Sequence, residues 1–374
     1  MSVWDSLVGQ PNAVATLRRA VDGASHAMTH AWLFTGPAGS GRSVAARAFA
    51  AALQCPQGGC GVCHSCSTAL AGTHPDVTLV RTELLSIGVR EVRQLIMHSA
   101  MTPTLGRWQT IIVEDADRVT ESGFNALLKG IEEPPEKTVW LLCAPTVDDI
   151  VPTVRSRCRQ VALVTPSATA VTTLLESEGV PRDQASFAAR VSQGHIGRAR
   201  AMATDPEVAR HREEVLAIPS KVGSLGGCLE AASWAVTTAQ DEASAATARL
   251  DEEERKKLAI VLGMDGGRAR RGATGMMKEL EEQQAMRAKR FVRDRLDLIL
   301  VELTAYYRDV LVCQTDAGSD LINADFVAPI EVLAASSTPE STLRRLDAIQ
   351  ECRLALASNV TPQLAFEALM VSLA

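Results

Sequence analysis

Residues 36–43 have the composition of a loop that binds phosphate. Their sequence is Gly-Pro-Ala-Gly-Ser-Gly-Arg-Ser, after an apolar run that ends at residue 34. Gly36, Gly39 and Gly41 allow backbone N–H groups to converge on one anion, and the helix expected to follow adds the positive end of its dipole. The spacing fits the pattern G-x-x-x-x-G-K-[ST], except that Arg42 replaces the lysine.

This replacement limits the chemistry that the loop can perform. A lysine ammonium is a compact charge that reaches the β- and γ-phosphates, whereas the guanidinium of Arg42 is wide, planar and forked. We therefore expect the loop to keep its fold, and the Ser43 hydroxyl to remain available to Mg²⁺, while ATP hydrolysis is weak or absent. A plainer interpretation is that the glycines only connect a buried strand to a helix.

Two acids, Glu114 and Asp115, follow the run 108–113, which reads as a buried strand. In phosphate-loop proteins a carboxylate at such a strand end holds Mg²⁺, and a second acid polarises the attacking water. The usual order is aspartate and then glutamate, and here it is reversed. The shorter Asp115 side chain would stay back from the water, which is a second reason to expect little hydrolysis.

Four of the nine cysteines lie within twelve residues, in the pattern C-x4-C-x2-C-x2-C. Four thiolates in short, glycine-containing loops are typical of a tetrahedral zinc site, and four protein ligands leave no open position for water. A redox C-x-x-C pair or two labile disulfides are the alternatives, and clustering in a cytoplasmic protein favours zinc. His64 could replace one thiolate, but it is expected to face solvent. The sequence therefore predicts a structural zinc site at Cys55, Cys60, Cys63 and Cys66.

Up to residue 165, the elements that must position these residues alternate between strands and helices. Runs that are apolar without interruption are typical of a parallel sheet covered on both faces. We predict a doubly wound α/β domain for residues 1–165, with a zinc module at 55–66. Its expected strands lie at 30–34, 77–81, 108–113, 139–144 and 160–164.

After residue 165 the strand signals stop and the pattern becomes helical. We predict a three-helix domain at 166–206 and an all-helical domain at 207–374, with a long amphipathic helix from about 276 to 313. Residues 263–275 are rich in glycine and arginine. Contact with a DNA backbone is one interpretation of this segment and a mobile linker is the other; its basic residues are Arg268, Arg270 and Arg271.

The composition narrows the class of protein. A chain of 374 residues has room for two or three domains, and a formal net charge of −6 argues against a protein that coats nucleic acid with its whole surface. The N-terminus has no basic segment before an apolar run, and no apolar stretch approaches membrane-spanning length. We expect a cytoplasmic protein without membrane contact.

Taken together, these features resemble the AAA+ subunits of the bacterial clamp loader. The motifs that carry the resemblance are the phosphate loop, the cysteine array after its helix, the acidic strand end, Ser156-Arg157-Cys158 and Gly197-Arg198-Ala199. The resemblance is strong over about the first 205 residues and extends beyond them only in helical content. It implies a RecA-like AAA+ fold, a helical lid and a C-terminal helical collar that holds the subunits together.

The resemblance also implies roles for single residues. Arg157 corresponds to an arginine finger that acts in trans on ATP bound to the neighbouring subunit, where a fixed guanidinium offsets charge on the transferred phosphoryl group. Thr146 resembles the sensor-1 residue and Arg198 the sensor-2 arginine of the lid. A surface arginine that caps its strand is the plainer interpretation of Arg157, and a solvated arginine that of Arg198.

Within that family, Arg42 and the reversed order of the two acids resemble the stator, the subunit that keeps a rigid shape while its neighbours hydrolyse ATP. They differ from the pattern of the gamma/tau ATPase. The resemblance then implies a subunit of the DNA polymerase III holoenzyme whose partners are gamma/tau and delta. It would meet the sliding clamp and primed DNA through the assembly, and bound ATP or ADP with Mg²⁺ is left open. The alternatives are a gamma/tau-like motor ATPase and a zinc-anchored DNA-binding protein.

Overall fold

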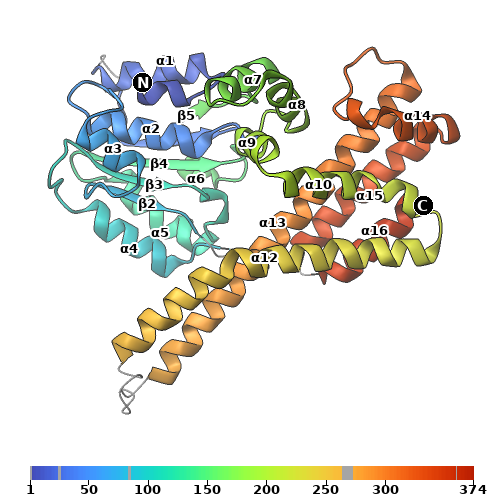
Figure 1. The fold of residues 1–374 in the computed structure, drawn as a ribbon. Coiled ribbons are helices and arrows are strands. Elements are labelled where there is room, and N and C mark those ends of the chain that lie inside the picture. The colour runs from blue at the N-terminus through green and yellow to red at the C-terminus, as the bar shows by residue number, and fades with distance from the viewer. Residues whose placement is uncertain (1, 24–26, 83–85, 263–272, 359) are drawn as a thin grey trace. The chain divides into compact units, whose positions relative to one another are not determined.

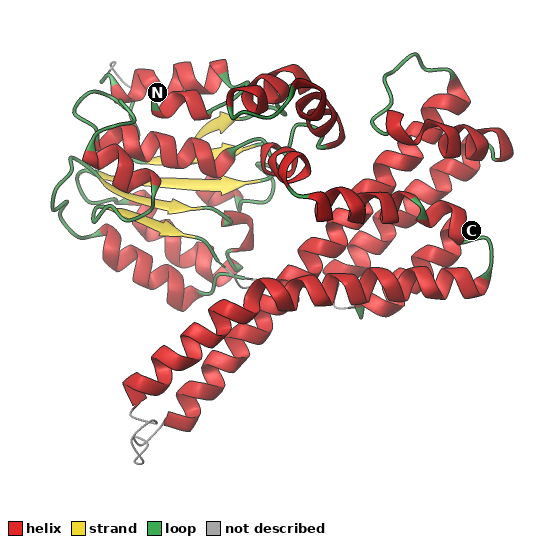
Figure 2. Cartoon of the chain, in the orientation of Figure 1, coloured by secondary structure: helices red, strands yellow, loops and turns green. Residues whose placement is uncertain are grey.

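The computed structural model describes residues 2–23, 27–82, 86–262, 273–358 and 360–374. The chain divides into two compact units, Met1–Thr204 and Asp205–Ala374. The described strands all belong to the first unit, and the second unit is helical (Figures 1 and 2). The finer division into three domains, with boundaries at 165 and 206, stays a prediction.

The first unit is built on five parallel strands. They are β1 (Ala31–Thr35), β2 (Val77–Val80), β3 (Gln109–Val113), β4 (Thr138–Ala144) and β5 (Arg159–Ala162). Their order in the sheet is β2-β3-β4-β1-β5, and Leu33 of β1 lies opposite Leu142 of β4 and Gln160 of β5. Every residue of β1, β3 and β4 is buried, which explains their uninterrupted apolar sequences. The predicted parallel α/β fold is confirmed.

Helices cover both faces of this sheet (Figure 2). Alternate side chains of β1 point to opposite faces: Trp32 and Phe34 pack in one core cluster with Phe49, and Leu33 packs in the other with Leu127. The helical elements are η1 (Val3–Ser6), α1 (Pro11–Val21), α2 (Arg42–Gln54), α3 (His64–Leu70), α4 (Val89–Ser99), η2 (Ala116–Arg118), α5 (Glu121–Glu132), α6 (Pro152–Arg155), α7 (Ala168–Ser177), α8 (Arg182–Val191) and α9 (Ile196–Thr204).

The second unit buries its own apolar core. Leu300, Tyr307 and Phe366 are among the fully buried side chains of this core. None of the described helices combines the length and the apolar character needed to cross a membrane. The helical elements of the unit are α10 (Pro206–Leu216), α11 (Ile218–Lys221), α12 (Leu225–Leu262), α13 (Ala273–Thr315), η4 (Ala324–Phe326), α14 (Val327–Ser336), α15 (Pro339–Ala357) and α16 (Pro362–Leu373).

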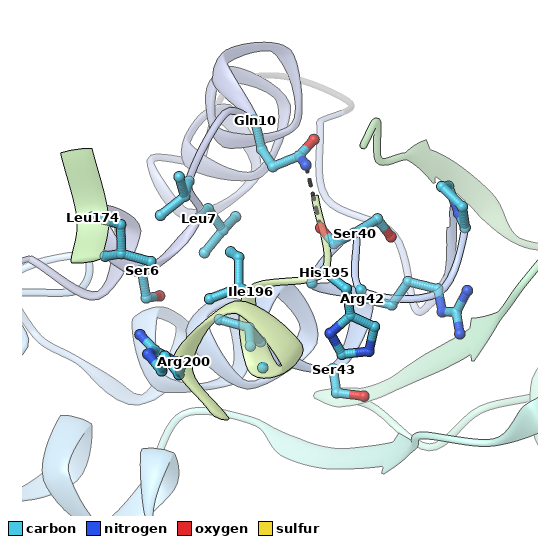
Figure 3. A pocket seen from close by; sticks show the side chains of 16 residues that line it. Ser6, Leu7, Gln10, Ser40, Arg42, Ser43, Leu174, His195, Ile196 and Arg200 are labelled. Carbon is cyan, nitrogen blue, oxygen red and sulfur yellow. Dashed lines mark hydrogen bonds between the residues drawn. The ribbon is translucent and has the colours of Figure 1, made fainter. Parts of the chain in front are cut away.

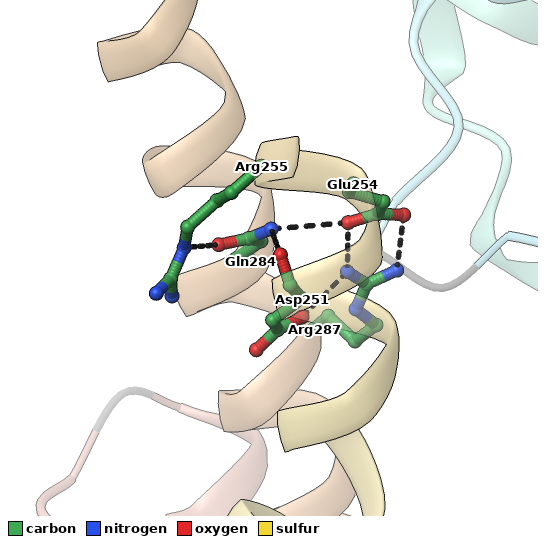
Figure 4. Close-up of polar contacts among 5 residues, drawn as sticks. All are labelled: Asp251, Glu254, Arg255, Gln284 and Arg287. Atoms are coloured by element: carbon green, nitrogen blue, oxygen red, sulfur yellow. Dashed lines mark hydrogen bonds and ion pairs between the residues drawn. The ribbon is translucent and has the colours of Figure 1, made fainter. Parts of the chain in front are cut away.

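Helices α12 and α13 pack along one another and enclose a polar cluster (Figure 4). Arg287, which is only 6% exposed, lies with its Nη2 2.6 Å from Asp251 Oδ1 and also pairs with Glu254. Gln284 Nε2 donates to the Asp251 carbonyl at 3.0 Å, and its Oε1 accepts from Arg255 Nε at 2.8 Å. Polar partners buried between two helices favour one register over its neighbours, so this cluster fixes how the two helices align.

Helices α3 and α14 are among the elements whose bounds were not predicted from the sequence. The seven residues of α3 begin inside the cysteine array, where the Cys63 side chain caps the helix, and the metal pattern concealed this start. Helix α14 contains Pro329 in its first turn and has no clear polar face. Helix α13 begins at Ala273, three residues earlier than predicted, and most of the glycine- and arginine-rich segment 263–275 lies outside the described residues.

Candidate nucleotide and metal sites

The phosphate loop lies where β1 passes into α2. Gly41 has φ +91°, in the left-handed region that favours glycine, and it caps α2 so that Arg42 is the first helical residue. A pocket of about 370 Å³ lies beside the loop (Figure 3). Its walls come from the N-terminal segment, the loop itself, α7 and the start of α9, so the predicted loop fold is present.

The Arg42 side chain is engaged by the loop's own backbone. Its Nη1 donates a hydrogen bond to the carbonyl of Gly36, and Figure 3 shows the guanidinium directed away from the side of the pocket where Leu174 and Arg200 lie. A lysine at this position would extend its ammonium toward a bound phosphate. The Arg42 side chain instead bonds the backbone of its own loop.

The acid at the end of β3 is likewise paired with a cation of the chain. Arg47 of α2 places Nε 2.8 Å and Nη2 2.7 Å from Oε1 of Glu114, whose side chain is 6% exposed. Mg²⁺ would have to displace this guanidinium to use that oxygen. The half-buried Asp115 comes next in the chain, at the start of η2. Arg47 was not predicted as a site residue, although a basic residue between buried alanines of α2 is a usable signal.

The start of α9 lies directly on the phosphate loop. A Cβ added to Gly39 would lie 2.5 Å from the Cα of His195, so only glycine fits there. His195 Nδ1 accepts the backbone N–H of Arg198 at 3.2 Å and thereby caps the helix. Burial, with the nearby charges of Arg198 and Arg42, lowers the pKa of His195 below its ordinary 6.5.

Gln10 ties the N-terminal segment to the other side of the loop. Its Nε2 donates to the Ser40 carbonyl at 3.2 Å (Figure 3) and to the Val164 carbonyl at 2.6 Å, while its Oε1 accepts the Val164 N–H at 3.1 Å. Among the described residues, the buried Ser40 hydroxyl has no hydrogen-bond partner. An orphaned hydroxyl in the loop fits a phosphate oxygen, so the residues are compatible with a bound nucleotide even though Arg42 and Glu114 are engaged.

The two residues compared with AAA+ sensors, Thr146 and Arg198, differ in burial, and neither lines the pocket. Thr146 is exposed and its hydroxyl bonds Asp149 Oδ2 at 2.9 Å. Arg198 is half-buried and is not among the residues that line the pocket. Arg200, two positions later, does line it and pairs with Glu178. Arg200 was not predicted as a pocket residue, because the side of α9 on which each arginine lies depends on where the helix begins.

Arg157 lies just after α6, outside this pocket. Its Nη1 donates to the Thr153 carbonyl at 2.8 Å and to Ser156 Oγ at 3.1 Å, and its Nη2 lies 2.7 Å from Glu132 Oε1. The side chain is 40% exposed, so the guanidinium is available to a second molecule. Its role in trans stays a prediction.

The four predicted cysteines form one cluster. Their sulfurs lie within 4.8 Å of one another, and Cys55 Sγ is 3.7 Å from the sulfurs of both Cys60 and Cys63. Four ligands about 2.3 Å from a tetrahedral ion lie roughly 3.8 Å apart, so the spacing fits a structural metal. Burial alone would raise the pKa of Cys55, but backbone N–H groups at 57, 59 and 60 lower it to about 6. Burial raises the pKa of Cys66, so a bound cation would have to stabilise the thiolate of that ligand.

Comparison with known proteins now decides the family. Residues 9–167 match the family described as "DNA polymerase III, delta subunit", and residues 279–374 match "DNA polymerase III, delta subunit, C terminal". The DNA polymerase III subunit delta' of Bacillus subtilis is 25% identical over 97% of this chain and 96% of its own length. The chain belongs to the DNA polymerase III delta-prime family, the clamp-loader family related to gamma/tau.

Two other relatives match a shorter part of this chain at higher identity. Subunit delta' of Pseudomonas aeruginosa is 39% identical over 39% of this chain and 46% of its own length. Subunit gamma/tau of Mycobacterium tuberculosis (strain H37Rv) is 35% identical over 48% of this chain, which spans only 32% of that relative. A solved gamma subunit-related protein of Thermotoga maritima is 17% identical with a TM-score of 0.43, over 95% of this chain and 96% of its own.

We expect the contact of His195 with the phosphate loop to weaken in acid. The pKa of His195 is lower in the folded chain than in the unfolded chain, so the stability it contributes is present above about pH 6.5 and is lost as the pH falls. Urea unfolding between pH 5 and 8 should show a free energy of unfolding that rises with pH, with a smaller slope in His195→Gln.

The control for this series is His98→Gln, which removes an exposed histidine. Its slope should match that of the unchanged chain. Some slope will remain in every variant because burial also lowers the pKa of His74. A slope in His195→Gln equal to that of the unchanged chain would contradict the assignment.

Proposed function

We propose that this protein is the delta-prime stator of the DNA polymerase III clamp loader. Its partners would be the gamma/tau and delta subunits, and through them it would help to load the sliding clamp onto primed DNA at the expense of ATP. The family match and the delta' relatives support this proposal. The observation that carries the stator role is the pairing of Arg42 and Glu114 with groups of the chain itself.

Because Arg42 and Glu114 are both engaged by groups of the same chain, we expect this subunit to hydrolyse little or no ATP of its own. Hydrolysis in phosphate-loop proteins depends on a cation at the β- and γ-phosphates and on a metal held at the strand end. Here the guanidinium of Arg42 is bound to Gly36, and Arg47 neutralises Glu114. A bound nucleotide would contact Gly39, Gly41 and Ser43, and when present it would contribute phosphate charge that holds the loop and α9 together.

A gamma/tau-like motor is the second candidate, since the gamma/tau relative is 35% identical over half of the chain. A stator and a motor of one family would share the fold of the sheet and of the phosphate loop. The two candidates differ at the loop cation and at the strand-end acid, and both of those groups favour the stator.

In this proposal the catalytic contribution comes from Arg157. The exposed guanidinium would enter the ATP site of the adjacent subunit and offset charge on the transferred phosphoryl group. Because the arginine arrives only with the neighbour, hydrolysis becomes coupled to assembly.

The cysteine cluster would hold zinc as a structural ion. The first turn of the chain is fastened to the cluster, with Val3 N–H bonded to the Gly59 carbonyl at 3.1 Å and Trp4 Nε1 to the Gly58 carbonyl at 3.2 Å. The ion would therefore stabilise the end of α2 and the N-terminal segment that reaches the phosphate loop. All four cysteines are used as ligands, which leaves zinc no position for catalysis.

Arg157→Ala should remove the finger without unfolding the chain. In a loader assembled with gamma/tau and delta subunits, we expect the clamp- and DNA-stimulated ATPase rate to fall at least about tenfold, because an arginine finger stabilises the transition state strongly. Arg182→Ala, which removes an arginine that is 87% exposed, should leave the rate unchanged. An assembled loader that keeps its full rate with Arg157→Ala would remove the finger assignment.

Metal analysis tests the zinc proposal. Protein purified without chelator should contain about one equivalent of zinc, and Cys63→Ser should lose it and expose the 55–66 segment to protease. Cys313→Ser changes a cysteine far from the cluster in sequence and should keep the metal. Well under one equivalent in the unchanged chain would refute a zinc site.

A further inference from the structure

The guanidinium of Arg157 is held by three groups of its own chain. Thr153 and Ser156 lie in the turn that carries the arginine, whereas Glu132 comes from another element, the end of α5. Among the described residues, the contacts of the Arg157 guanidinium are made by Nη1 and Nη2, and Nε takes part in no hydrogen bond or ion pair. One edge of the guanidinium is therefore bound while another stays open.

We propose that Glu132 is a positioning residue that orients the Arg157 finger for the neighbouring subunit's ATP. The inference rests on the proposed function of Arg157 and assigns a role to a second residue. The carboxylate would fix one Nη2–H, and the remaining N–H groups would face outward toward a phosphate oxygen.

The backbone on both sides of this pair is anchored. Ile131, next to Glu132, is fully buried, and Val154, three residues before Arg157, is fully buried in the same core cluster. Pro134 and Pro135 come directly after Glu133 in the sequence and prevent α5 from continuing. The carboxylate and the guanidinium are therefore presented by rigid segments that share one core, as accurate positioning requires.

The ion pair is poorly suited to stabilising the fold. Both side chains are about 40% exposed, at 40% for Arg157 and 44% for Glu132, and exposed pairs of this kind contribute little to stability. The pair can instead fix the conformation of the Arg157 side chain. An unrestrained arginine loses rotamer freedom each time it binds its target. A carboxylate that holds the fork beforehand removes part of that loss from the reaction.

The test uses the assembled loader and two neighbouring glutamates. Glu133 is exposed and caps α5, and no described residue pairs with its side chain, so Glu133→Ala is a matched control for Glu132→Ala. We expect Glu132→Ala to lower the kcat for ATP about five- to tenfold with KM unchanged, and Glu133→Ala to leave kcat unchanged. Glu132→Gln should be intermediate, because its amide oxygen can still accept a hydrogen bond.

A double-mutant cycle separates positioning from a structural role. In an Arg157→Ala background, Glu132→Ala should cause no further loss, and loader assembly should be unaffected in every variant. Equal rates for Glu132→Ala and Glu133→Ala, or additive losses in the double variant, would overturn the positioning role while the finger stands. An Arg157→Ala loader with an unchanged rate would instead refute the finger itself, and the positioning role with it.

Discussion

The ion pair between Arg47 and Glu114 is the interaction on which this account depends. It joins α2, which follows the phosphate loop, to the strand-end acid that a hydrolysing protein would give to Mg²⁺. With Arg42 bound to Gly36, it leaves the loop with its fold and without a cation directed at the phosphates. Both contacts of the Arg47 guanidinium are charge-assisted and converge on one carboxylate oxygen, so Mg²⁺ could use that oxygen only by displacing them.

The surroundings of the loop extend this constraint to the rest of the first unit. His195 lies against Gly39 from the start of α9, and Gln10 bonds the loop and Val164, two residues after β5, from the other side. Contacts within the chain therefore hold the loop in place without a bound nucleotide. In the proposed stator role, such a subunit would keep one shape through the ATP cycle of its neighbours, and its contribution to their chemistry would come from Arg157.

Much of the architecture could be predicted because it is written in local patterns. The buried strands appear as uninterrupted apolar runs, and the cysteine cluster appears as a spacing that few other structures use. The pairings at the site could not be predicted in the same way, since Arg47 and Glu114 are 67 residues apart and meet only through the sheet order. The choice of Arg200 over Arg198 as a pocket residue depended on the exact phase of α9, which sequence patterns locate poorly.

ATP turnover by the isolated chain is the decisive test of whether its phosphate loop hydrolyses nucleotide. Purified protein, with zinc retained and no other subunit present, would be incubated with Mg²⁺ and ATP and assayed for released phosphate. We expect the rate to equal that of a Ser43→Ala variant prepared in the same way, because neither protein can position a metal and a cation on the phosphates. A steady rate that Ser43→Ala abolishes would show that the loop hydrolyses ATP, and would contradict the stator.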